Sequence, residues 1–155
     1  MNATAKQRPT IALAMGDPAG VSPELTAKLA ALDEAHAAAR LIIIGDKRVF
    51  DAGAVVAGTA TAFTVIGAGD AIPPRAGPVF IDLKHLDPAT IKRGEATKAG
   101  GTFALANYRH ALERVKRGDA QAVCFTPFNK HAMRLADASY DDEIGFTAGV
   151  LGTTG

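Results

Sequence analysis

Short apolar runs recur along the chain, and each is followed by glycine or a polar turn. They cover residues 10–15, 41–44, 61–66, 79–81 and 120–125. Runs of this length without polar alternation are typical of strands that are buried on both faces, as in a parallel sheet. The sequence therefore predicts five strands, and residues 41–44, which are leucine and three isoleucines, form the clearest of them.

Helical patterns alternate with these runs. The first predicted helix begins at Pro23, which suits an initial helical position because it lacks an N–H that would otherwise need a partner. Ser22 is a candidate N-cap, because its hydroxyl can accept hydrogen bonds from free amides. Leu25, Leu29 and Leu32 share one face of this helix and are expected to point into the core.

Two further helices are predicted, at residues 47–56 and from Gly101 to Gly118. Residues 67–77 and 87–99 are rich in glycine, proline and polar side chains, which favour loops. Strands that alternate with helices predict an α/β fold with a largely parallel sheet flanked by helices. Ligands of such sheets bind beyond the carboxyl ends of the strands.

Charge and composition narrow the possible partners. The 155 residues carry a net charge of +1, and 6% of them are aromatic. A nearly neutral chain with few aromatic rings does not favour binding to nucleic acid. No window approaches the roughly 18 to 20 apolar residues of a membrane span, and the apolar run after the polar N-terminus is too short for a signal peptide. These features predict a soluble, cytoplasmic protein.

The lone cysteine, Cys124, excludes an internal disulfide and is compatible with a reducing compartment. It lies within an apolar run at residues 122–125. We therefore expect a small buried hydrophobic residue and not a nucleophile.

The first segment with chemical potential, residues 16–24, is called the corner below. It joins the first strand to the first helix, and Gly16 and Gly20 allow a positive φ or close approach of a ligand to the backbone. Asp17 and Glu24 add carboxylates, and the helix N-terminus favours an anion. The spacing fits neither a dinucleotide fingerprint nor a P-loop. A ligand-binding turn and a purely structural turn both remain open.

The second segment, residues 126–130, is called the lysine segment below. It follows the last predicted strand and offers a hydroxyl from Thr126, an amide from Asn129 and a positive charge from Lys130. Together these groups could hold a phosphate or a carboxylate. A strand-to-helix turn with a solvated lysine is the alternative.

The corner resembles the opening signature of the 4-hydroxythreonine-4-phosphate dehydrogenase family, Gly-Asp-Pro-Ala-Gly-Ile-Gly-Pro-Glu. Seven of the nine positions are identical, Val21 replaces isoleucine, and Ser22 replaces the second glycine. The lysine segment is similar to the family's Thr-(Ala/Gly)-Pro-x-x-Lys, with a separation from threonine to lysine of four residues instead of five. This resemblance implies that Thr126, Lys130 and Asn129 contact a phosphorylated substrate and that the corner shapes the cleft.

The resemblance also implies an isocitrate/isopropylmalate dehydrogenase-like fold and NAD-dependent oxidation, with decarboxylation, of a small phosphorylated hydroxy acid such as 4-hydroxythreonine 4-phosphate. It implies a homodimer with an anionic small-molecule substrate. Family members are about twice as long as this chain. Residues 1–125 are accordingly predicted to form the first part of the dehydrogenase fold and residues 126–155 the truncated start of a second domain, so the isolated chain is expected to lack turnover.

One position departs from the family pattern. The family has Gly-His-Thr-Glu, whose histidine binds a divalent metal such as Zn²⁺, Mg²⁺ or Mn²⁺, where this chain has residues 145–148 with Phe146 at the histidine position. No metal ligand is therefore assigned. His131 is expected at the surface, and residues 141–143 are expected in a solvated acidic loop in which Asp142 is a remote candidate for a cation ligand.

The departure leaves several interpretations open. A divergent branch could act on a four-carbon sugar-acid phosphate or on a cis-dihydrodiol carboxylate. The chain could instead be an anion-binding module without catalysis. In a third interpretation it is an unrelated flavodoxin-like domain, and the likeness of its corner is a coincidence.

Overall fold

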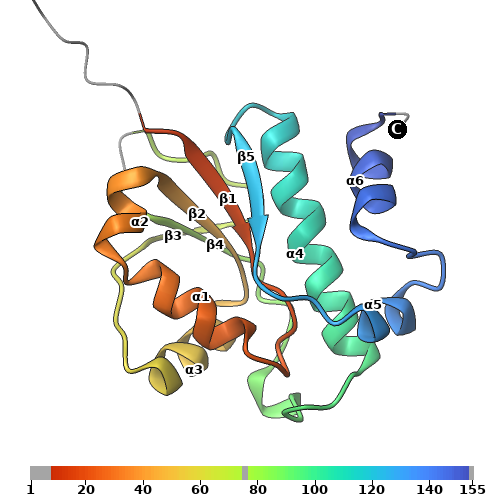
Figure 1. Ribbon diagram of the computed structural model, residues 1–155. Helices are drawn as coiled ribbons and strands as arrows, with labels where there is room; N and C mark the ends of the chain where they lie inside the picture. Colours follow the sequence, from red (N-terminus) through yellow and green to blue (C-terminus); the bar gives the residue numbers. More distant parts are fainter. Residues whose placement is uncertain (1–7, 75–76, 154–155) are drawn as a thin grey trace, which may run out of the picture.

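The computed structural model describes residues 8–74 and 77–153, so two residues of the loop predicted at 67–77 lie outside the described part. Five parallel strands form one sheet in the order β3-β4-β2-β1-β5 (Figure 1). This confirms the predicted α/β fold with a parallel sheet. The strands are β1 (Thr10–Ala14), β2 (Arg40–Gly45), β3 (Thr64–Gly67), β4 (Val79–Asp82) and β5 (Ala122–Phe125).

Helices cover both faces of the sheet. Alternate residues of the central strands point to opposite sides, so Ile42 and Ile44 belong to one core cluster and Ile43 to another. The first cluster packs against the long helix α4, and the second packs against α1 and α3. The helices are α1 (Ser22–Ala30), α2 (Asp33–Ala38), α3 (Lys47–Ala57), the 3₁₀ turn η1 (Pro88–Thr90), α4 (Lys98–Lys116), α5 (Lys130–Ala136) and α6 (Glu143–Leu151).

The inner face of α1 differs from the prediction. Leu29 is partly buried and packs against the second core cluster, as predicted. Leu25, however, is 42% exposed, and Leu32, which lies beyond the end of the helix, is 47% exposed, whereas the buried positions of the helix carry smaller side chains. The cause is the close contact with α3, where a Cβ on Gly53 would lie 2.4 Å from the carbonyl carbon of Pro23. Two helices this close leave no room for leucine between them.

The expectation of a buried Cys124 is also wrong, since this residue is exposed. It lies on β5, the edge strand of the sheet, which pairs with β1 on one side. Among the described residues no strand covers the other side, and Phe125 is accordingly 43% exposed. An apolar run thus belongs here to an edge strand and not to a fully buried one.

The part of the chain after β5 packs against α4. A Cβ on Gly101 of α4 would lie 1.9 Å from the carbonyl oxygen of Ala132, so this glycine permits the close packing of α5. The helix α6 also packs against α4, through Phe146. It was not predicted, because Gly145 and Gly149 lower its helix propensity. The division at residue 125 into two domains stays a prediction.

None of the helices in the described ranges is both long and apolar enough to span a bilayer.

Candidate functional site

The corner and the lysine segment lie side by side at the carboxyl end of β1 and β5. The amide of Asp17 donates to the carbonyl oxygen of Pro127 at 2.9 Å, and the amide of Gly16 donates to Thr126 Oγ1 at 3.0 Å. The two motifs are separated by about a hundred residues in sequence, but pairing of β1 with β5 brings their ends together. The sheet topology therefore joins the two predicted segments into one site.

Gly16 is required by this contact. A Cβ at this position would lie 2.2 Å from the carbonyl oxygens of both Thr126 and Pro127. Neither Gly16 nor Gly20 adopts a positive φ. Backbone conformation, one of the two reasons that the sequence offered for glycine here, therefore does not apply. The close approach at Gly16 is made by the chain's own backbone.

Three hydroxyl groups, of Ser22, Thr26 and Thr126, form a buried cluster beneath the corner. Their residues are 0–4% exposed. Ser22 Oγ accepts from the Gly16 amide at 2.7 Å and hydrogen-bonds to Thr126 Oγ1, and Thr26 Oγ1 lies 3.1 Å from Thr126 Oγ1. Ser22 is therefore not the N-cap that the sequence predicted, since α1 already begins at this residue and its hydroxyl points back toward β1. Thr26 was not singled out from the sequence, because a threonine within a helix carries no signal of its own.

Asn129 connects the lysine segment to Asp17. Its side-chain oxygen accepts from the amide of Ala132, which makes it the N-cap of α5, and its Nδ2 donates to Asp17 Oδ2 at 3.3 Å. The other oxygen of Asp17 accepts from the amide of Ala19 at 3.0 Å. Both predicted side chains are thus partly buried and hold the two segments in a fixed relation.

Lys130 projects from the first turn of α5 and is about half exposed. Its Nζ lies 3.1 Å from Glu143 Oε2 of α6. Burial raises the pKa of the Glu143 carboxyl, but its backbone amide and Lys130 outweigh this and lower the pKa overall. Burial and the neighbouring Glu143 carboxylate raise the pKa of Tyr140, so this phenol stays protonated. Lys130 is therefore already paired with the Glu143 carboxylate, and an anionic ligand of Lys130 would have to displace that carboxylate.

Among the described residues, no three histidine, cysteine, aspartate or glutamate side chains are grouped so that they could hold a metal ion. Phe146 lies in an aromatic cluster, stacked on Tyr108 at 5.5 Å and below the guanidinium of Arg109 at 5.1 Å. Asp142 caps α6 by accepting from Gly145 at 2.7 Å, and His131 is exposed as expected. The structure provides a packing role for Phe146 and a capping role for Asp142.

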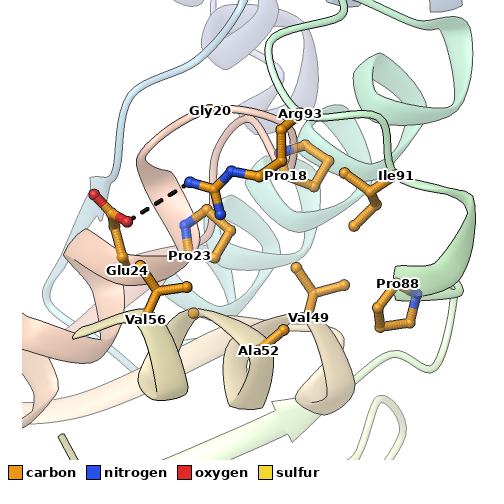
Figure 2. Close-up of a pocket in the computed structure, with 11 residues that line it drawn as sticks. Pro18, Gly20, Pro23, Glu24, Val49, Ala52, Val56, Pro88, Ile91 and Arg93 are labelled. Atoms are coloured by element: carbon orange, nitrogen blue, oxygen red, sulfur yellow. Dashed lines mark ion pairs between the residues drawn. The ribbon is translucent and has the colours of Figure 1, made fainter. Parts of the chain in front are cut away.

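Gly20 and Glu24 face a different side of the corner from the lysine segment. They line a cavity whose other walls come from α3 and from the residues around η1 (Figure 2). Glu24 Oε2 lies 3.7 Å from a guanidinium nitrogen of Arg93 at its mouth. Arg93 was not predicted, because it lies in the polar stretch 87–99, which has no periodic pattern. Of the seven predicted site residues, Gly20 and Glu24 thus line this cavity, whereas the other five lie where the corner meets the lysine segment.

A parallel sheet with its polar groups gathered beyond the strand ends is typical of α/β enzymes that bind small ligands. The chain belongs to the family described as "Pyridoxal phosphate biosynthetic protein PdxA", whose model matches residues 37–155. The identification made from the corner is therefore confirmed, and the flavodoxin-like alternative is wrong.

Relatives support this assignment over nearly the whole chain. The "Putative 4-hydroxythreonine-4-phosphate dehydrogenase 2" of Rhizobium meliloti (strain 1021) is 58% identical over 98% of this chain and 44% of its own length. The "Putative D-threonate 4-phosphate dehydrogenase" of Symbiobacterium thermophilum is 33% identical over 90% of this chain and 41% of its own. The chain thus spans less than half the length of these curated relatives.

A solved structure confirms the fold class. The crystal structure of a 4-hydroxythreonine-4-phosphate dehydrogenase from Burkholderia phymatum matches 97% of this chain and 46% of its own, with a TM-score of 0.85 and 26% identity. The chain therefore has the dehydrogenase-like α/β fold that the resemblance implied.

Proposed function

We propose that this chain forms the substrate-binding part of an NAD-dependent dehydrogenase that oxidises a small phosphorylated hydroxy acid, such as 4-hydroxythreonine 4-phosphate. The observation that carries the proposal is the junction of the corner with the lysine segment, which places Lys130 beside a fixed turn at the strand ends. Relatives named as 4-hydroxythreonine-4-phosphate dehydrogenases support the substrate class.

In this proposal the chain's residues bind and orient the substrate, and bound NAD would supply the hydride acceptor for the oxidation of the carbinol carbon, whose hydroxyl would release its proton. The β-keto acid would then lose CO₂, and a proton would take the place of the carboxylate on the α-carbon. Lys130 holds the anionic end of the substrate after exchanging Glu143 for it, and Asn129 and Thr126 keep the segment in place. We derive no step from a metal, because Phe146 occupies the position of the family histidine and the described residues supply no ligand set. We further propose that two copies of the protein form a homodimer.

A second candidate substrate is a four-carbon sugar-acid phosphate. One relative is named as a D-threonate 4-phosphate dehydrogenase, and it is 33% identical to this chain. Both candidates carry a phosphate, so the lysine segment would serve either of them. An anion-binding module without catalysis would use the same contact.

Calorimetric titration of the 155-residue chain tests the proposal. The phosphorylated hydroxy acid is compared with its unphosphorylated form, and 4-hydroxythreonine 4-phosphate with D-threonate 4-phosphate. Lys130→Ala removes a charge-assisted contact worth about 1.5–3 kcal/mol, so affinity should fall by about 10- to 140-fold. Lys28→Ala, at an exposed lysine of α1, is the matched control and should leave affinity unchanged. Equal binding of phosphorylated and unphosphorylated acids would contradict the proposal.

A further inference from the structure

The connection between β3 and β4 has to return across one face of the sheet, because the two strands are adjacent and parallel. Its described residues, 68–74 and 77–78, contain no helix. Ile72 packs against the core cluster that includes residues of α4, and Arg40 of β2 donates to the carbonyl oxygen of Pro73 at 2.6 Å. The connection is therefore held in place by contacts with other elements.

Arg114 of α4, which is 3% exposed, makes two of these contacts. Its Nη2 donates to the carbonyl oxygen of Ala68 at 2.7 Å, and its Nη1 donates to the carbonyl oxygen of Asp70 at 3.1 Å. Nη1 also donates to Asp119 Oδ2 at 3.1 Å. The remaining nitrogen, Nε, donates to Nε2 of His110 at 3.3 Å. All three guanidinium nitrogens thus have an acceptor, and the histidine ring supplies one of these acceptors.

The hydrogen bond to Arg114 requires a particular protonation state of the His110 ring. Nε2 can accept only while it carries no proton, so the neutral ring has its hydrogen on Nδ1. When the ring takes up a second proton, Nε2 becomes a donor that faces the donor Nε of Arg114. Two positive charges then lie side by side, one of them on a buried guanidinium. The protonated ring and the guanidinium therefore cannot both keep their positions.

The surroundings of His110 favour the neutral ring in the folded chain. Burial and the neighbouring Arg114 lower the pKa of His110, and Glu113 opposes them. Arg117 and His85, which follows β4, lower this pKa further. Because the folded pKa lies below the ordinary value of about 6.5, a chain with the contact broken binds the proton first as the pH falls through that value. Acid therefore favours the state in which His110 and Arg114 are separated.

We propose that His110 is an acid-sensitive latch, which keeps Arg114 on the β3–β4 connection while its Nε2 is unprotonated and releases that connection from α4 when the ring takes up a proton. The strand β3 is an edge strand that pairs with β4 on one side. Release of its outgoing connection would therefore loosen this edge of the sheet while the central strands stay folded. The inference does not rest on the proposed function, because none of these residues belongs to the corner or to the lysine segment.

An NMR titration of the isotopically labelled 155-residue chain from about pH 7.5 to about pH 5 tests the latch, because this range spans the ordinary histidine pKa. The ring signals of His110 report its protonation, the Nε–H signal of Arg114 reports their contact, and the methyl signals of Ile72 report the connection. The Ile72 signals should shift in parallel with the ring signals of His110. Protection of the Arg114 Nε–H against hydrogen exchange, corrected for the intrinsic rate at each pH, should fall by at least about tenfold.

His110→Gln keeps an oxygen that can accept from Arg114 but does not titrate in this range, so the protection of the Arg114 Nε–H should change by less than about twofold. The control is His131→Gln, the same change at the exposed histidine of α5, which should behave as the wild type does. Circular dichroism verifies that both variants fold, and the wild-type titration decides alone if His110→Gln does not. The inference is overturned if His110 stays neutral down to about pH 5, if the Ile72 and Arg114 signals do not follow its titration, or if His110→Gln keeps the tenfold loss.

Discussion

Replacing Thr126 by valine removes one hydroxyl from the contact between the corner and the lysine segment while keeping the shape of the side chain. Thr126 is 4% exposed, and its Oγ1 accepts from the Gly16 amide at 3.0 Å. The same oxygen hydrogen-bonds to Ser22 and lies 3.1 Å from Thr26 Oγ1. The substitution therefore tests whether this buried cluster holds the two segments together.

The expected magnitude follows from the partners that remain. The Gly16 amide keeps Ser22 Oγ at 2.7 Å, and Thr26 Oγ1 keeps the carbonyl oxygen of Ser22 at 2.7 Å. The Ser22 hydroxyl, however, loses its hydrogen bond to Thr126 Oγ1 in a fully buried position, where water cannot replace it. Leaving a buried hydrogen-bonding position unsatisfied costs about 1–3 kcal/mol, so we expect a loss of about 2 kcal/mol in the free energy of unfolding.

Urea unfolding followed by circular dichroism measures this loss, and thermal unfolding should show a decrease of about 4–8 °C in Tm for a chain of this size. Thr61→Val is the matched control, because the buried Thr61 Oγ1 has no hydrogen-bond partner among the described residues. That variant should be neutral or more stable than the wild type. The reasoning is refuted if Thr126→Val unfolds within 0.5 kcal/mol of the wild type, or if both valine variants behave alike.

Three further predictions concern the fold. Gly101→Ala places a methyl group 1.9 Å from the carbonyl oxygen of Ala132 and should lower the free energy of unfolding in urea by at least about 2 kcal/mol. Its control, Gly149→Ala, lies in a helix position with open space and should be neutral or gain up to about 1 kcal/mol. Equal effects of the two substitutions would contradict the close packing of α4 and α5. Arg114 is 3% exposed and donates to the carbonyl oxygens of Ala68 and Asp70, so Arg114→Met should destabilise by about 2–4 kcal/mol, and a loss below 1 kcal/mol would argue against this anchor. Burial raises the pKa of Asp46, but hydrogen bonds from Arg48 and from two backbone amides lower it overall from 3.8 to about 2. Its carboxylate therefore stabilises the fold by about 2 kcal/mol above pH 4 and loses this contribution as the pH falls toward 2. Asp46→Asn should therefore narrow its stability gap to the wild type over that range in acid unfolding, and a gap independent of pH would refute the assignment.

The parallel α/β fold could be predicted because its buried strands are apolar on both faces, and residues 41–44 illustrate this most clearly. The inner face of α1 could not, since Leu25 and Leu32 have the periodicity of a core stripe. What excludes Leu25 is the contact between Pro23 and Gly53, which depends on the distance between two helices, and Leu32 lies beyond the end of α1. Helical periodicity indicates which residues share a face but not how closely a neighbour approaches.

Some features of the candidate site could likewise be predicted from the sequence, and others could not. Proximity of the corner to the lysine segment follows from two strand ends meeting at one edge of the sheet, which the apolar pattern anticipates. Ser22 illustrates the limit, because its position suggested a cap for its own helix whereas its hydroxyl points toward Thr126. The Glu24–Arg93 pair could likewise not be predicted from the sequence, because it depends on the path of a loop whose sequence has no periodic pattern.

The claim that most needs a direct test is that the corner and the lysine segment bind one anionic ligand together. Amide chemical-shift mapping of the 155-residue chain, titrated with 4-hydroxythreonine 4-phosphate, addresses it in a single experiment. We predict that the amides of Gly16, Asp17, Asn129 and Lys130 shift in parallel and give one common Kd. Shifts in one segment without the other, or shifts gathered around Arg109 of α4, would contradict this account.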